Sequence, residues 1–101
     1  MTIKSAITEL DLKETPVAKL LHTGIAFKVI ILTFKKHMVL NENKTSVPTK
    51  LIVINGKVNY ISDTSNIIID TYEEHEIPAE ETNAIEALED SLCILIQSYR
   101  N

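Results

Sequence analysis

Residues 49–61 read Thr-Lys-Leu-Ile-Val-Ile-Asn-Gly-Lys-Val-Asn-Tyr-Ile, and this stretch decides the fold. Two runs rich in β-branched and aliphatic residues flank the pair Asn55-Gly56. A type I′ turn needs positive φ at both central residues, which Asn and Gly tolerate best. The pattern therefore predicts a β-hairpin that closes at this pair.

The first arm of this stretch carries aliphatic side chains on both faces. Side chains alternate along a strand, so Thr49, Leu51 and Val53 share one face while Ile52 and Ile54 share the other. A strand that is apolar on both faces is typical of a sandwich or barrel. If Leu51 and Val53 point inward, Ile52 and Ile54 point outward. Because exposed aliphatic patches usually mark interfaces, we expect a homodimer.

The composition indicates a single domain with an aliphatic core. The chain has 101 residues, of which 45% are hydrophobic and 24% are charged. That length supports one core but not two. Aromatic residues make up only 5% and Trp is absent, so Ile, Leu and Val must build the core. These β-branched and aliphatic residues favour strands.

The charge pattern argues against several classes of partner. The net charge is -4, so the chain lacks the basic surface that nucleic acids require. Its longest strongly apolar run, residues 29–34, is too short for a membrane span, which needs about 20 residues. No apolar signal segment opens the chain, and we expect a cytoplasmic protein. Cys93 lies in an apolar run, which predicts a buried, unreactive thiol.

Further strands are predicted where β-rich runs are bounded by turn residues, at residues 17–21, 25–34, 38–40, 67–70 and 92–97. Residues 71–76 read as a polar connection. Residues 2–15 fit a helical turn or an edge strand, and residues 82–88 fit a helix or an alternating strand. Many short strands at this spacing predict an antiparallel sandwich or barrel.

Two stretches resemble conserved regions of the cupin family. Residues 54–58, Ile-Asn-Gly-Lys-Val, resemble the hydrophobic-x-Gly-x-Val end of the first region. Residues 77–91 begin Ile-Pro and resemble the second region, in which an aliphatic strand and a tight turn follow. The resemblance covers about residues 17–97. It implies one small RmlC-like cupin domain over residues 1–101, an all-β antiparallel jelly-roll barrel (double-stranded β-helix) with a short N-terminal extension.

The cupin motifs fix where the family's metal ligands and glycines would fall. Anchored on Gly56 and Pro78, the three metal-binding histidines fall on Asn43, Thr45 and Asn83, and the glutamate on Thr49. The family glycines fall on His37, Gly56, Tyr72 and Glu80. The spacing holds throughout, while the four ligand types are missing. Because transition metals need imidazole, thiolate or carboxylate ligands, we expect no metal and no cofactor.

Two hypotheses remain open for the polar residues at these four positions. They could form a satisfied polar patch, since an unpaired buried polar group costs about 1–3 kcal/mol. Alternatively they could bind a small polar ligand in the barrel mouth, walled by Leu51, Val53 and Ile85.

The sequence supports a binding function better than catalysis. His22, His37 and His75 lie where solvated turn residues are expected, and no catalytic residue can be assigned. The first hypothesis is a metal-independent binding or regulatory protein. The alternatives are an isomerase-like or dioxygenase-like enzyme that uses non-standard residues or a weakly held ion, and a structural or interaction protein. Fold alone does not decide among them.

Overall fold

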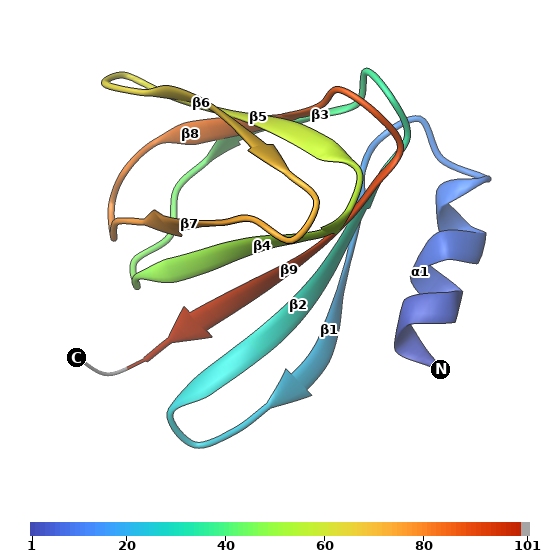
Figure 1. Ribbon diagram of the computed structural model, residues 1–101. Coiled ribbons are helices and arrows are strands. Elements are labelled where there is room, and N and C mark those ends of the chain that lie inside the picture. Colours follow the sequence, from blue (N-terminus) through green and yellow to red (C-terminus); the bar gives the residue numbers. More distant parts are fainter. Residues whose placement is uncertain (100–101) are drawn as a thin grey trace.

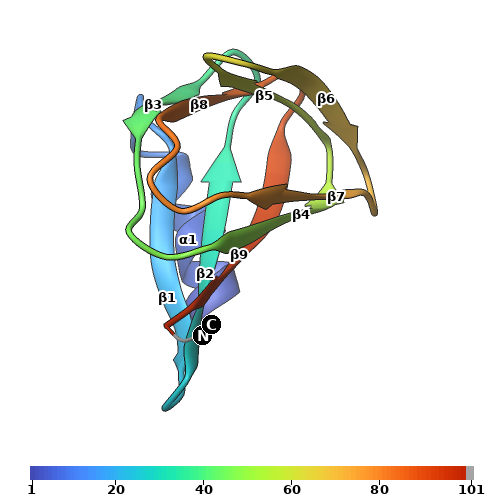
Figure 2. The ribbon, with the colours of Figure 1, turned by 90° about the vertical axis from the view of Figure 1, so that its left-hand side faces the viewer.

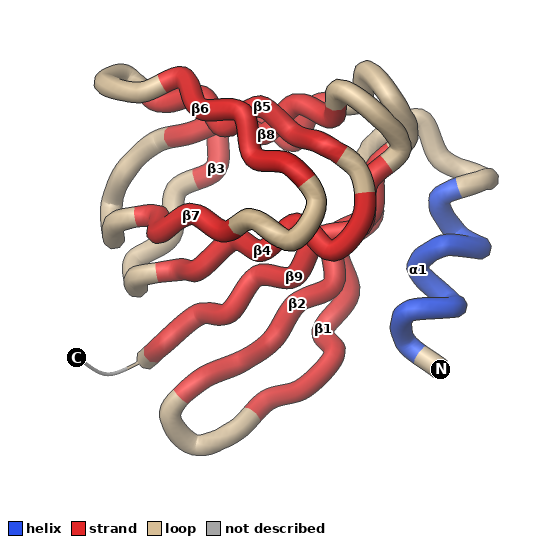
Figure 3. The backbone as a smooth tube through the Cα atoms, viewed as in Figure 1, coloured by secondary structure: helices blue, strands red, loops and turns tan. Residues whose placement is uncertain are grey.

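The computed structural model describes residues 1–99, without the side chains of residues 42 and 43. Over these residues one helix is followed by nine strands (Figures 1 and 3). The elements are α1 (Thr2–Leu10), β1 (Val17–Thr23), β2 (Phe27–Phe34), β3 (Val39–Asn43), β4 (Thr49–Asn55), β5 (Lys57–Ser62), β6 (Asn66–Asp70), β7 (Glu74–Ile77), β8 (Asn83–Ala87) and β9 (Ser91–Ser98).

The strands form two sheets that face each other. One sheet has the order β1-β2-β9-β4-β7 and the other has the order β3-β8-β5-β6. Every neighbouring pair is antiparallel. In Figure 2 the four-stranded sheet arches over the strongly twisted five-stranded sheet, and α1 lies behind β1 and β2. The predicted all-β antiparallel jelly roll is confirmed, with α1 as the N-terminal extension.

The predicted hairpin at Asn55-Gly56 is wrong. β4 pairs with β7 and β9, whereas β5 pairs with β6 and β8, so the turn carries the chain from one sheet to the other. Gly56 has φ +103°, and Asn55 is not among the described residues with positive φ, which excludes a type I′ turn. The turn residues were identified correctly, but each arm finds its partners elsewhere in the chain.

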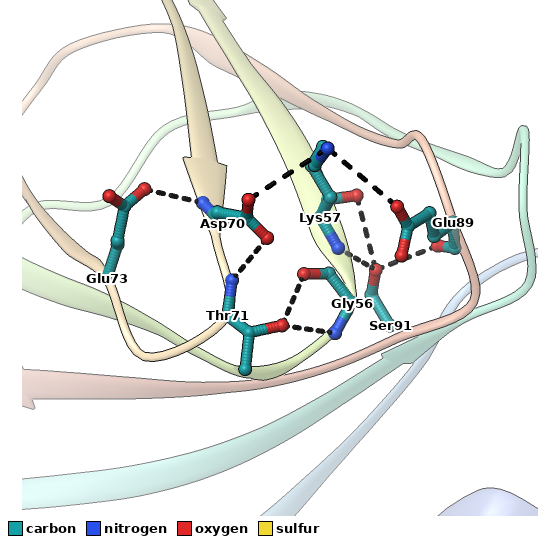
Figure 4. Close-up of polar contacts among 7 residues, drawn as sticks. All are labelled: Gly56, Lys57, Asp70, Thr71, Glu73, Glu89 and Ser91. Carbon is teal, nitrogen blue, oxygen red and sulfur yellow. Dashed lines mark hydrogen bonds and ion pairs between the residues drawn. The ribbon is translucent and has the colours of Figure 1, made fainter.

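Hydrogen bonds from two other turns hold the corner at Gly56 (Figure 4). The Gly56 N–H donates to the Thr71 hydroxyl at 3.1 Å, and that hydroxyl donates to the Gly56 carbonyl at 2.8 Å. The Lys57 N–H donates to the Ser91 hydroxyl at 3.1 Å. A Cβ at position 56 would meet the Asp90 carbonyl and would lie 2.7 Å from the Ser91 Cα. Glycine is therefore required here for both backbone conformation and space.

The main core lies between the two sheets. Leu51 and Val53 of β4 are fully buried in it, Thr49 is 2% exposed, and Ile52 and Ile54 on the opposite face are half-buried. The predicted alternation of β4 is confirmed. The other buried members of this core are Leu32, Phe34, Val58, Tyr60, Ile69, Ile77, Ile85, Ala87 and Cys93.

Helix α1 covers part of the outer face of the five-stranded sheet. Ala6 and Leu10, one turn apart, form a second buried cluster with Val17 and Ile31. Ile31 is paired with Ile94 across the sheet, and β2 presents Leu32 to the opposite, inner face. The helical alternative for the N-terminal segment is therefore the one adopted.

Within the described residues, no helix is both long and apolar enough to cross a membrane. The cytoplasmic location stays a prediction.

Two segments adopt strands that the sequence had assigned to a connection or left open between helix and strand. Residues 71–76 were predicted to be a polar connection, but residues 74–76 belong to β7, an edge strand that pairs only with β4. In β8 the side chains of Asn83, Ile85 and Ala87 are buried and their neighbours are half-buried, so the strand alternative is correct.

Cys93 is fully buried, as predicted, and burial raises the pKa of its thiol to about 12.

Candidate functional site

A cavity of about 220 Å³ opens between the two sheets. Its inner part is lined by buried residues, namely Leu32, Thr49, Ile77, Asn83, Ile85 and Gln97. Its outer part is lined by exposed or half-buried residues, namely Ala18, Ile30, Leu40, Thr45 and Leu95. The cavity is thus apolar over most of its wall, with polar groups gathered at the buried end and on Thr45.

The structure brings most of the predicted site residues to this cavity. Thr45, Thr49 and Asn83 all line it, and so does the predicted wall residue Ile85. The Asn43 side chain lies outside the described residues; its backbone is paired with that of Asn83. The other two predicted wall residues of β4 lie in the main core and do not line the cavity.

Gln97 is the polar lining residue that the sequence analysis missed. It is 8% exposed and lies near the end of β9, and its polar side chain does not by itself indicate a buried position. Gln97 is paired with Thr49 across the sheet. Knowledge of this strand register would have placed Gln97 beside the predicted site residue Thr49.

The two threonine hydroxyls lie close to each other and to one loop carbonyl, that of Val47. The Thr45 hydroxyl donates to the Val47 carbonyl at 2.8 Å. The Thr49 hydroxyl lies 3.3 Å from the same carbonyl and 3.4 Å from the Thr45 oxygen. Each hydroxyl has one hydrogen, which these contacts use, so both oxygens remain available as acceptors.

The Asn83 side chain is only half satisfied. Its amide nitrogen donates to the Glu81 carbonyl at 3.2 Å. Its amide oxygen is buried and has no hydrogen-bond partner among the described residues. An unpaired buried acceptor of this kind costs about 1–3 kcal/mol.

The loop that carries Glu81 is fixed from two sides. The Tyr60 hydroxyl donates to the Glu81 carboxylate, and burial together with this contact raises the pKa of Tyr60 above its ordinary range. The Glu80 N–H donates to the Thr45 carbonyl at 2.7 Å, and Lys44 forms an ion pair with Glu80 at 3.5 Å. The loops before β4 and before β8 are therefore linked where they border the cavity.

The backbone supports the register of the cupin resemblance. The four positions at which the family has glycine all have positive φ: +77° at His37, +103° at Gly56, +69° at Tyr72 and +67° at Glu80. The first, third and fourth are not glycine here, and no other non-glycine residue of the described chain has positive φ. The left-handed turns of the motifs are thus kept although the residue type has changed.

The residues around the cavity do not fit a transition-metal centre. Its described lining offers hydroxyls and amides but no imidazole, thiolate or carboxylate. His22 and His37 are exposed, and the His75 ring packs against that of Tyr60 with centroids 4.5 Å apart. In the part of the chain that the structure describes, no three His, Cys, Asp or Glu side chains are grouped to hold an ion.

Comparison with known proteins relates the chain by structure rather than by sequence. No family model matches the sequence, and no curated protein matches it. Solved structures do match the fold. An RmlC-like cupin from Desulfovibrio desulfuricans has a TM-score of 0.78 at 18% identity, over 85% of this chain and 84% of that protein.

Two further structures give the same result. A cupin superfamily protein from Desulfitobacterium hafniense has a TM-score of 0.79 at 14% identity, over 87% of this chain and 81% of its own. A cupin-like protein from Thermotoga maritima has a TM-score of 0.75 at 21% identity, over 83% of this chain and 68% of its own. The chain has the fold of the small RmlC-like cupins.

Proposed function

We propose that the protein is a binding protein that holds a small molecule in the cavity between its sheets, without the help of a metal ion. The observation that carries this proposal is the buried, unpartnered amide oxygen of Asn83 in the cavity wall. Buried polar groups in folded proteins are nearly always paired, so an exception on a residue that lines a cavity is consistent with a partner that comes from outside the chain.

The alternative of a purely structural polar patch is supported less well. A patch that replaced a lost metal site would satisfy its own hydrogen bonds, as the hydroxyls of Thr45 and Thr49 do. The oxygen of Asn83 stands outside that arrangement. Its cost is offset if a bound molecule donates to it.

The alternative of catalysis has no support from the lining residues. General acid–base catalysis needs a side chain that exchanges a proton near neutral pH, and nucleophilic catalysis needs an activated hydroxyl, thiol or amine. The described residues around the cavity include no histidine, carboxylate, lysine or cysteine. Binding is therefore the function that the geometry supports best.

NMR of the protein with labelled Ile and Leu methyl groups tests this proposal, using a set of single-ring compounds as probes. We expect the probes to shift methyl signals of Leu32, Ile77 and Ile85, while signals of Leu51 change little. The control is Ala18→Phe, because Ala18 is exposed at the outer part of the cavity and a larger side chain there would obstruct it. Shifts confined to other surfaces, or unchanged in this variant, would count against the proposal.

We also propose that the protein is a homodimer that associates through the outer face of the five-stranded sheet. Ile52 and Ile54 are half-buried on that face, beside the area covered by α1. Sedimentation at micromolar concentration should give twice the 11.4 kDa chain mass, and Ile52→Asp should shift it to the monomer. A clean monomer for the unmodified protein would exclude this assembly.

A further inference from the structure

The cavity provides an uncharged environment of limited size. No described lining residue carries a charge, and Leu32, Ile77 and Ile85 contribute apolar walls. Its volume of about 220 Å³ is small for a binding pocket. An apolar cavity of about 150 Å³ is large enough for benzene, so the space here suits a molecule with one ring or a short branched chain.

The polar groups of the cavity lining offer mostly acceptors. The Asn83 oxygen is unpartnered, and the oxygens of Thr45 and Thr49 have already used their hydrogens. Gln97 is the other buried amide side chain of the described lining, and an amide can both donate and accept. A molecule that enters must therefore bring a donor for Asn83, and it can accept a bond from Gln97 in return.

From this arrangement we infer that the ligand is a neutral molecule with a compact apolar body and one hydroxyl or amide group, which donates to the Asn83 oxygen. This inference rests on the proposed function, and it names the chemical class that the same cavity selects. A carboxylate is a poor match, because it brings only acceptors and a negative charge to a site lined by acceptors without a cation. A wholly apolar molecule leaves the Asn83 oxygen unpaired.

One cation lies near this site in the sheet register and provides a check. Lys28 of β2 is paired with Gln97 of β9, so the two share the inner face. Lys28 is half-buried but is not part of the cavity lining. If an anion were the ligand, Lys28 would be the residue to hold it.

The test compares three single-ring probes of similar size: phenol, which brings a donor, toluene, which has no polar group, and benzoate, which is an anion. Dissociation constants are measured by NMR titration for the unmodified protein and for Asn83→Leu. The matched control is Asn59→Leu, because Asn59 also has a buried, unpartnered side-chain oxygen but does not line the cavity. Circular dichroism checks that each variant folds, and Asn83→Ala serves as a second variant.

We expect phenol to bind, benzoate to bind at least tenfold more weakly than phenol, and Asn83→Leu to reduce the preference for phenol over toluene by about threefold to tenfold, the value of one hydrogen bond. Asn59→Leu should leave that preference unchanged. If phenol and toluene bind but Asn83→Leu changes their ratio by less than twofold, the inference is overturned while the proposed function stands. Benzoate binding that exceeds phenol binding and is lost in Lys28→Met would also overturn it. If none of the three probes binds in the cavity, the proposed function itself fails.

Discussion

Replacing Gly56 by alanine should strongly destabilise the protein, although the change adds only one methyl group. The residue has φ +103°, where a side chain costs about 1–2 kcal/mol. The new Cβ would also collide with the Asp90 carbonyl and lie 2.7 Å from the Ser91 Cα, and overpacking of this kind costs about 1–3 kcal/mol. The two contributions together lower the free energy of unfolding by about 2–5 kcal/mol, a large part of the total for a domain of this size.

Urea unfolding followed by circular dichroism measures this change. With a slope of about 1–2 kcal/mol per molar for a small domain, the midpoint should fall by 1 M or more, given the loss of about 2–5 kcal/mol. Gly24→Ala is the matched control, because its Cβ would lie 3.4 Å from the nearest Phe27 atom and Gly24 does not have positive φ. The control should stay within about 1 kcal/mol of the unmodified protein. If Gly56→Ala also stayed within 1 kcal/mol, the account of the corner between the sheets would be refuted.

Three further predictions concern strain, titration and metal content. Tyr72→Gly should raise the free energy of unfolding by up to about 1 kcal/mol, because glycine adopts the positive φ of +69° without strain and the 84% exposed Tyr72 side chain loses little packing. A decrease of more than about 1 kcal/mol in urea unfolding would contradict this. Since burial raises the pKa of Cys93 to about 12, the unfolded thiol ionises first and stability should fall as pH rises above about 8.5. That fall, up to about 1.4 kcal/mol per pH unit, should be absent in Cys93→Ala, and equal pH profiles for the two proteins would exclude it. Elemental analysis of protein purified without an affinity tag should find no stoichiometric Zn, Fe, Mn or Ni, and a near-equimolar amount of any of these would contradict the prediction.

The all-β fold could be predicted because most strands carry a local pattern. β4 alternates between buried and half-buried residues, and β9 is a long apolar run. What the sequence could not supply was the pairing between strands. Asn55-Gly56 predicts a local turn, but whether the two arms pair depends on β7, β9, β6 and β8, which compete for the same edges.

β7 was missed for a related reason. Its residues Glu74, His75 and Glu76 are polar, and only Ile77 is fully apolar and buried. An edge strand gains its hydrogen bonds from one neighbour and does not need an apolar run, so its sequence resembles a loop. Lys50 of β4 forms ion pairs with Glu74 at 3.1 Å and with Glu76 at 3.3 Å, a contact between strands that no local pattern reveals.

The candidate site was predicted in part through spacing within the cupin motifs. That spacing led to Thr45, Thr49 and Asn83, which lie around one cavity although none of them keeps a ligand residue type. The depth of each side chain could not be derived in the same way. Leu51 lies one alternation beyond Thr49 on the same face, yet it belongs to the main core, because the cavity ends at the level of Thr49 and Ile85.

The crystal structure of the protein soaked with phenol, in a buffer free of added metal ions, tests the central claim most directly. The claim is that this cupin barrel binds a small neutral molecule through Asn83 where a metal would otherwise be expected. We predict a phenol ring between Leu32 and Ile85, with its oxygen at hydrogen-bond distance, about 2.7 Å, from the Asn83 oxygen. A metal ion coordinated by Thr45, Thr49 or Asn83, or a cavity without phenol at saturating concentration, would contradict the account.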